Sequence, residues 1–304
     1  MNESNEVKKF DDEIDLGQLF SIIWDKKFLI GSFTAIAALF SVMYALYLPN
    51  IYTSSSLLAP TSQDESLSSQ LGGLSGLAGL AGVSLPSGTI TNSQLAVKRI
   101  ESFEFFSKYF LPNIKLENLT AVKEWNSQNN IISYNDSDFD SKTNKWIKSE
   151  SGPSAQKAFK EYKKVLNISQ EELTGLVYLS IEHKSPYIAK KWVDIIIYNI
   201  NESMREIDIQ DAQNSIDFLK ESSQSVSIQS IKEVVSKLLE RQMQTLMLAS
   251  SNKAYVLKTI NSPIVPEEKS GPSRALICIL GTFLGGILSI LFVLSQNFRK
   301  FSNN

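Results

Sequence analysis

The chain has 304 residues, of which 43% are hydrophobic and 20% charged, and its formal net charge is −2. This charge balance, without a basic stripe interleaved with aromatic residues, excludes a nucleic-acid-binding surface, so we expect no nucleic-acid partner. The single cysteine, Cys278, excludes an intramolecular disulfide, and the fold must be stabilised by its own core.

Two apolar runs without any charged residue stand near the two ends, at residues 28–48 and 275–294. A helix of about 20 residues crosses the ~30 Å hydrocarbon core of a bilayer. Because the backbone must satisfy its own hydrogen bonds in lipid, each run should be helical. The sequence therefore predicts transmembrane helices over residues 28–48 and 275–294, with membrane lipids as partners.

Basic residues flank both apolar runs on their outer sides. They are Lys8, Lys9, Lys26 and Lys27 before the first run, and Arg299 and Lys300 after the second. Basic residues close to a span tend to stay in the cytoplasm. We therefore expect cytoplasmic tails over residues 1–27 and 295–304, and export of residues 49–274.

The first part of the exported domain mixes strand, loop and helix signals. Residues 51–60 predict a strand, because they are rich in β-branched and aromatic residues. The Gly/Leu-rich segment 71–88 is open to two interpretations, a mobile loop or an apolar element that packs near the membrane or on a neighbouring subunit. The helical spacing of residues 94–110 predicts one helix that ends before Pro112.

The middle of the domain is polar before its pattern becomes regular. Residues 118–150 are rich in Asn, Ser and Asp and predict a loop or short helices. Residues 155–166 have the spacing of an amphipathic helix. Ser169 and Glu172 then have the spacing of a capping box for one short turn. Residues 176–182 predict a strand.

A long helix begins after Ser185 and Pro186, a pair typical of a helix start. No proline or glycine interrupts residues 187–222, which would form a rod of about 54 Å. After a weak break at 223–230, residues 231–249 predict a second helix that pairs with the first in antiparallel fashion. A rod of this length should project from a small domain or pack against other subunits.

The chain returns through a predicted strand at residues 254–260 and a proline-marked linker. Pro263, Pro266 and Pro272 predict a stiff, extended connection into the second apolar run.

The predicted fold class is an α+β membrane protein, with two transmembrane helices flanking a periplasmic α/β base domain that carries a long protruding helical arm. The expected boundaries are 49–185 and 250–262 for the base, 186–249 for the arm and 263–274 for the linker.

Three segments together resemble the Wzz-type chain length determinants, also called polysaccharide co-polymerases. They are IDLGQLFSIIWDKKFLI (14–30), TGLVYLSIEHKSPYIAKKWVDIIIYNIN (174–201) and VPEEKSGPSRALI (265–277). The most specific piece is PSRALI, which places Pro272, Ser273 and Arg274 at the start of the second apolar run.

This resemblance implies a protein of the bacterial inner membrane whose domain lies in the periplasm. It also implies a homo-oligomeric ring, commonly an octamer. The family regulates the chain length of a lipid-linked polysaccharide, typically the O-antigen of lipopolysaccharide, which a separate polymerase makes. Members of its capsule branch carry or pair with a tyrosine kinase. We expect no kinase domain in this chain, so the alternative is a membrane adaptor or sensor for capsule or exopolysaccharide export that works with a separate cytoplasmic tyrosine kinase.

Small residues recur at helical spacing in both apolar runs. Gly281 and Gly285 form a G-x-x-x-G pair beside Gly286, and Gly31 and Ala35 are spaced alike. Such residues let membrane helices approach closely, although glycine is frequent enough in spans for the pattern to arise by chance. We expect helix–helix contact there, either between the two spans or with the polymerase.

Catalytic chemistry has little support in the sequence. His183 has no metal-ligand partner within motif spacing, and no phosphate-binding G-x-x-x-x-G-K-[ST] loop occurs. Asp136, Asp138 and Asp140 resemble a cation site, but an Asn/Ser-rich solvated turn explains them better. We therefore expect a non-enzymatic protein with no cofactor and no metal.

Overall fold

A computed structural model of the chain describes residues 23–61, 91–225, 228–251 and 254–302. The chain divides into two units. Unit 1 consists of residues 1–49 and 271–304, and unit 2 of residues 50–270. The interpretations of residues 1–22 and of the Gly/Leu-rich segment 71–88 lie outside the described residues.

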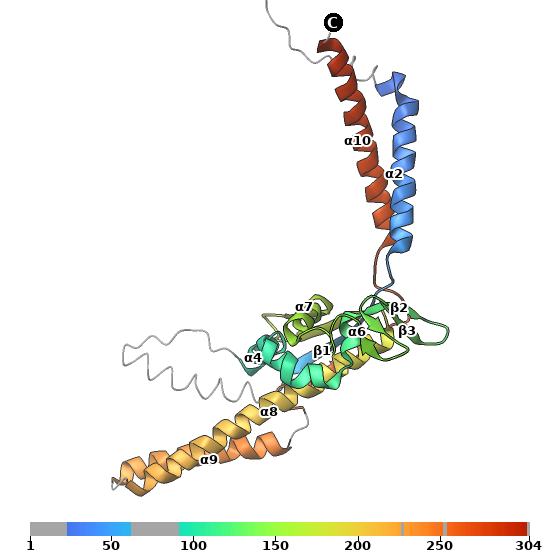
Figure 1. Cartoon of the computed structure of the whole chain (residues 1–304). Coiled ribbons are helices and arrows are strands. Elements are labelled where there is room, and N and C mark those ends of the chain that lie inside the picture. The colour runs from blue at the N-terminus through green and yellow to red at the C-terminus, as the bar shows by residue number, and fades with distance from the viewer. Residues whose placement is uncertain (1–22, 62–90, 226–227, 252–253, 303–304) are drawn as a thin grey trace, which may run out of the picture. The chain divides into compact units, whose positions relative to one another are not determined.

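Unit 1 contains two long apolar helices, α2 (Lys27–Tyr47) and α10 (Arg274–Ser302), which run side by side (Figure 1). The segments Lys27–Tyr47 and Arg274–Gln296 are both long and apolar enough to cross a membrane. Only 6% and 11% of their most apolar windows are buried. Most of their apolar side chains therefore face outward, unlike those of a core helix in a soluble protein.

Unit 2 is built on a four-stranded antiparallel sheet. It contains β1 (Tyr52–Pro60), β6 (Leu166–Gln170), β7 (Val177–His183) and β8 (Leu257–Asn261) in the order β6-β7-β1-β8. The strands predicted at 51–60, 176–182 and 254–260 are thus confirmed. The first and last strands of unit 2 pair with each other, so the chain enters and leaves the sheet along neighbouring strands.

The core lies between this sheet and the first half of helix α8 (Pro186–Ser225). Alternate residues of β7 are buried, as expected for a strand with one covered face. Val177, Leu179 and Ile181 pack in one cluster with Val193 and Ile196 of α8. The predicted helix start at Pro186 is confirmed.

Aromatic side chains complete the core beside the sheet. They come from α5 (Phe103–Phe105), from a π-helical turn at Phe106–Phe110 and from α7 (Ala155–Val165). The ring centroids of Phe110 lie 4.7 Å from Tyr162 and 5.6 Å from Trp192. This cluster joins α5, the π-helical turn and α7 to the start of α8.

The single helix predicted over residues 94–110 is wrong. Helix α4 (Asn92–Ile100) ends at Ile100, and α5 begins with a new cap, because the Ser102 hydroxyl accepts a hydrogen bond from the Phe105 amide. A serine cap offers the backbone an alternative to continued helix. The apolar spacing continues across residues 101–102, so the sequence pattern does not reveal the break between the two helices.

The prediction of a loop or short helices over residues 118–150 is also wrong in part. After α6 (Leu116–Thr120), the chain forms two small hairpins, in which β2 (Val122–Asn126) pairs with β3 (Ile131–Tyr134) and β4 (Phe139–Asp140) with β5 (Lys145–Trp146). Asn130 and Asn144 have φ values of 54°, which asparagine tolerates better than most residues. The asparagines that suggested a loop thus make the turns of hairpins.

The capping box expected at Ser169 and Glu172 does not form. Ser169 lies in β6 and pairs with Tyr178 of β7. The turn between the two strands is instead stabilised by Thr174, whose hydroxyl donates to Glu171 Oε2 over 2.6 Å. The segment is therefore a strand and a hairpin turn.

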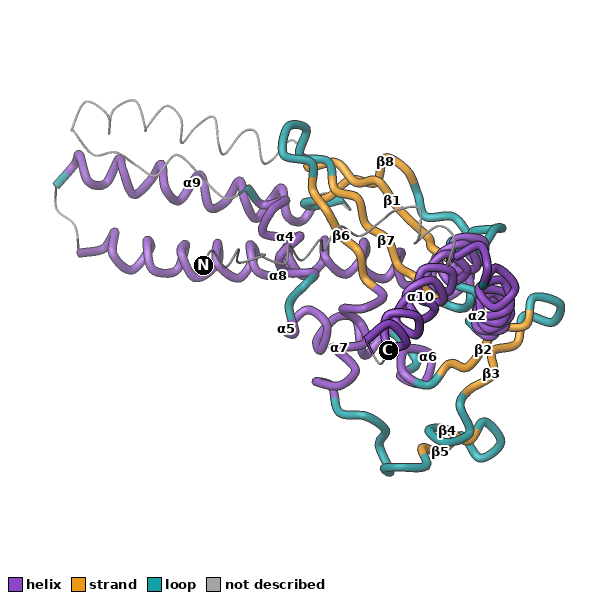
Figure 2. Tube along the Cα trace, turned by 90° about the horizontal axis from the view of Figure 1, so that it is seen from above, coloured by secondary structure: helices purple, strands orange, loops and turns teal. Residues whose placement is uncertain are grey.

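The second half of α8 forms a helical hairpin with α9 (Gln229–Ser251), as Figures 1 and 2 both show. Helix α8 has 40 residues, or about 60 Å. Ala212 and Ile216 of α8 and Val235 and Ala249 of α9 are buried in this part of unit 2. The predicted antiparallel helix pair is confirmed.

Asn201 of α8 fixes the place where the chain returns from α9 to the sheet. Its Oδ1 accepts hydrogen bonds from three successive backbone amides, those of Tyr255, Val256 and Leu257, over 2.8–3.0 Å. Its Nδ2 donates to the Leu257 carbonyl over 3.1 Å. This one side chain, which is only 5% exposed, thus provides hydrogen-bond partners for the backbone where the chain returns from α9 to the sheet.

We predict that Asn201→Ala strongly destabilises the protein, because three buried amides lose their acceptor. Each unsatisfied buried group costs about 1–3 kcal/mol, so three cost at least about 3 kcal/mol, and the melting temperature of the detergent-solubilised chain should fall by at least about 6 °C. Asn199→Ala is the matched control, since Asn199 makes one bond, to the Ile195 carbonyl. Equal melting temperatures for the two variants would contradict this role of Asn201.

Candidate functional site

Small residues bring helices α2 and α10 into close contact in unit 1. A Cβ atom added to Gly281 would overlap the Ser41 side chain, and one added to Gly285 would overlap Ala37 Cβ. At Gly286 it would lie 3.8 Å from Thr34 Oγ1. These three glycines therefore line the face of α10 that packs on α2.

Gly31 and Ala35 occupy a different face of α2. A Cβ added to Gly31 would meet nothing within 4 Å, and both residues are exposed. The structure thus brings Gly281, Gly285 and Gly286 to one interface and leaves Gly31 and Ala35 outside it.

Polar side chains add hydrogen bonds to this helix pair. Ser41 Oγ donates to the Ile277 carbonyl over 2.9 Å, and the hydroxyl oxygens of Thr34 and Ser289 lie 3.5 Å apart. Arg274 Nη2 donates to the Leu48 carbonyl over 3.4 Å, where α2 ends and α10 begins. In a lipid environment such bonds hold helices together where the hydrophobic effect does not.

Within unit 2 the proline-marked linker lies beside β1. Pro263 and Pro266 have no N–H, so they cannot donate to a strand ladder. Serine hydroxyls of β1 donate instead, with Ser54 Oγ to the Ile264 carbonyl and Ser56 Oγ to the Asn261 carbonyl, both over 2.7 Å. Asn261 is the last residue of β8, so the bond to Ile264 is the one that holds the linker against β1.

The two ends of unit 2 are joined directly by hydrogen bonds. The Ser270 amide donates to the Ile51 carbonyl over 2.8 Å, and Thr53 Oγ1 donates to Ser270 Oγ over 2.6 Å. In unit 1 the Gly271–Pro272 peptide is cis, and the Ser273 carbonyl accepts the Ile277 amide in the first turn of α10. Pro272, Ser273 and Arg274 therefore form the entrance to α10.

His183 is buried at the end of β7 and is fully engaged. Its Nε2 lies 2.9 Å from the Asn118 carbonyl, and its Nδ1 accepts from the Ser185 amide over 2.9 Å. These partners fix the Nε2–H tautomer, because a carbonyl only accepts and an amide N–H only donates. Burial lowers the pKa of His183. This histidine is a structural link between β7, α6 and the start of α8.

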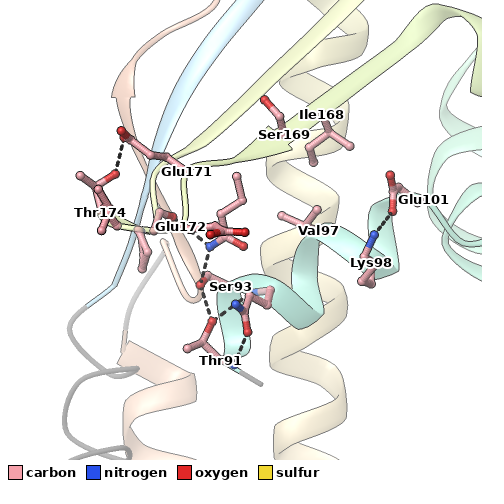
Figure 3. Close-up of a pocket in the computed structure, with 15 residues that line it drawn as sticks. Thr91, Ser93, Val97, Lys98, Glu101, Ile168, Ser169, Glu171, Glu172 and Thr174 are labelled. Carbon is pink, nitrogen blue, oxygen red and sulfur yellow. Dashed lines mark hydrogen bonds and ion pairs between the residues drawn. The ribbon is translucent and has the colours of Figure 1, made fainter. Parts of the chain in front are cut away.

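A cavity of about 750 Å³ lies in unit 2 between α4 and the β6–β7 hairpin (Figure 3). Most of its polar groups bind one another. Thr91 and Gln94 form a capping box at the start of α4, and Gln170 Nε2 donates to Ser93 Oγ over 3.1 Å. Lys98 pairs with Glu101 over 3.0 Å. These contacts hold α4 to the hairpin and leave few groups free for a ligand.

The DSDFD run does not gather into a cation site. Lys148 Nζ donates to Asp138 Oδ1 over 2.7 Å, and Thr143 Oγ1 donates to Asp140 Oδ2 over 2.7 Å. The Thr143 hydrogen bond lowers the pKa of Asp140. Among the described residues, no three His, Cys, Asp or Glu side chains are grouped so as to hold a metal ion.

Comparisons with known proteins bear on this arrangement. Residues 12–103, which include α2, β1 and α4, match the family model of Wzz, described as chain length determinant protein. The resemblance to the Wzz family is confirmed. This Wzz segment thus spans an apolar helix and the strand that pairs with both β7 and β8.

Two similar solved structures are a full-length bacterial polysaccharide co-polymerase and a fragment of WzzB, a polysaccharide co-polymerase from Salmonella Typhimurium. The first is 15% identical, covers 95% of this chain and 99% of its own, and has a TM-score of 0.42. The second is 13% identical, covers 73% and 100%, and has a TM-score of 0.31. Comparison with curated proteins gave no match. Both TM-scores are below 0.5.

We predict that Gly285→Leu separates α2 from α10, because the new side chain would overlap Ala37. Overpacking costs about 1–3 kcal/mol. The measurement is disulfide crosslinking between Thr34→Cys and Ser289→Cys in a Cys278→Ser background, whose yield should fall at least about fivefold. Gly31→Leu is the control and should leave the yield unchanged. Equal yields in the two variants would contradict the packing.

His183 should make stability depend on pH. Its pKa is lower in the folded than in the unfolded chain, where it is about 6.5. Its contribution is therefore complete above pH 6.5 and is lost as the pH falls toward the folded-state pKa. The melting temperature should drop between pH 7.5 and 5.5, and His183→Gln should reduce this drop. An identical pH dependence in the variant would rule out His183 as its source.

Proposed function

We propose that this chain is a non-enzymatic regulator of the chain length of a lipid-linked surface polysaccharide, with O-antigen as the first candidate polymer. The observation that carries the proposal is the match of residues 12–103 to the Wzz chain length determinant family. The two apolar helices that bracket unit 2 fit a protein that works beside a membrane-bound polymerase and its lipid-linked glycan.

The proposed location is the inner membrane of a bacterium, with residues 49–274 in the periplasm and both tails in the cytoplasm. Helices α2 and α10 are long enough to span, and they expose most of their apolar side chains. The basic residues that precede α2 and lie near the end of α10 favour this orientation.

Unit 2 is proposed to act as a homo-oligomer, a ring whose commonest family form is an octamer. Helix α9 buries Val235 and Ala249 but leaves other apolar side chains exposed. Among them are Ile231, Val234, Leu238 and Leu248, which are 40–56% exposed. Exposed apolar side chains that gather on one surface are typical of protein–protein contacts.

No enzymatic step is proposed. The matching family model is described as a chain length determinant. His183, the single histidine of the chain, has a backbone hydrogen-bond partner at each ring nitrogen. The function would instead rest on shape and assembly. In this proposal, Gly281, Gly285 and Gly286 join the two spans, while Gly31 and Ala35 remain available to a further membrane helix such as one of the polymerase.

The proposal predicts that deleting the gene removes the preferred length of the surface polysaccharide. Gel electrophoresis of the polysaccharide should show a broad distribution in place of a modal length. The wild-type gene should restore the mode, whereas Gly285→Leu should not. A length distribution unchanged by the deletion would contradict the proposal.

The deletion strain also distinguishes the proposed function from the alternative one. An adaptor for a cytoplasmic tyrosine kinase would change tyrosine phosphorylation and the amount of exported polymer. Its loss would leave the length distribution as it was. Blotting for phosphotyrosine beside the gel therefore distinguishes the two functions.

A further inference from the structure

A second cavity in unit 2, of about 460 Å³, differs in chemistry from the one between α4 and the β6–β7 hairpin. It lies where α6, the β2–β3 hairpin and the first turns of α8 meet. The residues that matter here are Lys115, Asn118, Asn130, Tyr134, Lys191 and Trp192. Its volume is within the range of about 300–1,000 Å³ that small-molecule sites occupy.

Two of the residues that line this cavity are asparagines, Asn118 and Asn130. Asn130 Oδ1 accepts from Trp125 Nε1 over 2.8 Å. Because an indole nitrogen only donates, this bond fixes the orientation of the carboxamide. Asn118 Oδ1 accepts from the Tyr134 hydroxyl over 2.6 Å. Both oxygens are thus occupied, and neither amide nitrogen has a partner within the described part of the chain.

Burial raises the pKa of Tyr134, with a smaller contribution from Glu117, so its hydroxyl keeps the proton that it donates to Asn118. Glu117 itself is not among the residues that line the cavity. Asn113 complements the donors, because its Nδ2 is bound to the Tyr109 carbonyl and its Oδ1 remains an acceptor.

Two lysines make the lining positive. Lys115 and Lys191 are exposed and take part in no ion pair among the described residues. The lining of this cavity contains no Asp or Glu, whereas that of the larger cavity contains Glu101, Glu171 and Glu172. The free groups are therefore two ammonium groups, two amide donors and one amide acceptor, which match an anion that also carries hydroxyls.

We propose that this cavity binds a carboxylate-bearing sugar unit of the polysaccharide. The lysines and the Asn118 and Asn130 amides would hold the carboxylate, and Asn113 Oδ1 would accept from a sugar hydroxyl. Ile132, Ile188 and the aromatic side chains of Tyr134 and Trp192 form apolar walls for the ring. This inference rests on the proposed function, because it names the class of polymer that the chain would contact.

The test is binding to the full-length protein in detergent micelles, measured by isothermal titration calorimetry. The probe is a tetrasaccharide of alternating glucuronic acid and N-acetylglucosamine. It should bind, and its carboxyl-reduced form should bind at least about tenfold more weakly, because the charge-assisted hydrogen bonds are lost. Absence of binding, or equal binding of the two forms, would overturn the proposal.

Variants locate the site. Lys191→Gln and Lys115→Gln should each weaken binding of the acidic tetrasaccharide roughly tenfold. Both lysines are exposed, so the melting temperatures should not change. Lys220→Gln, an exposed position farther along α8, is the matched control and should bind like the wild type. Wild-type affinity in both pocket variants would place the binding elsewhere and refute the assignment.

Inorganic phosphate distinguishes a sugar site from a simple anion site. Phosphate should compete only weakly, and competition at the affinity of the tetrasaccharide would refute the sugar assignment. The proposed function fails separately, since it is judged by the length distribution in the deletion strain. Intact length control together with failed binding would reject the cavity alone.

Discussion

The architecture of unit 2 depends on the carboxamide of Asn201. Its Oδ1 accepts hydrogen bonds from three successive backbone amides, those of Tyr255, Val256 and Leu257. Because buried amides need acceptors, these bonds favour the return of the chain from α9 at this place. That place sets the start of β8, and β8 in turn lies against β1. One residue of α8 therefore links the sheet to the helical hairpin.

Helix α8 joins two environments without interruption. Its first turns contribute Trp192, Val193 and Ile196 to the core beneath the sheet, and its later turns pack Ala212 and Ile216 toward α9. The first turns also supply Lys191 to the second cavity. His183 and Ser185 hold the beginning of this helix to α6, so the position of the cavity wall follows from the same contacts that bury the core.

Sequence periodicity predicted the parts whose apolar pattern is long and unbroken. The two apolar helices, the long α8 and the strand at 177–183 all have such patterns. It failed where a local hydrogen bond determines the structure. At Ser102 the side-chain cap begins a new helix, although the apolar pattern continues across this position. It failed again at Asn130 and Asn144, because asparagine marks a free loop and a tight hairpin turn equally well.

The sites show the same limit. The spacing of Gly281 and Gly285 indicates a small-residue face, but only the structure shows that Gly31 lies on another side. Asn201 stands in the run IIIYNIN, where an amide among isoleucines signals a buried hydrogen-bonding role that periodicity alone passes over. Lys115, Asn130 and Lys191 come from three separate segments, so no motif could have placed them around one cavity.

The bond between the Ser270 amide and the Ile51 carbonyl has an architectural consequence. Since the two ends of unit 2 are neighbours, the unit is an insertion into the connection between α2 and α10. Such insertions can lengthen, shrink or be exchanged without altering the separation of the two points at which they are attached. Helices α2 and α10 and the inserted domain can therefore diverge independently, and a chimera that swaps one insertion for another needs to preserve only the paired residues at its ends.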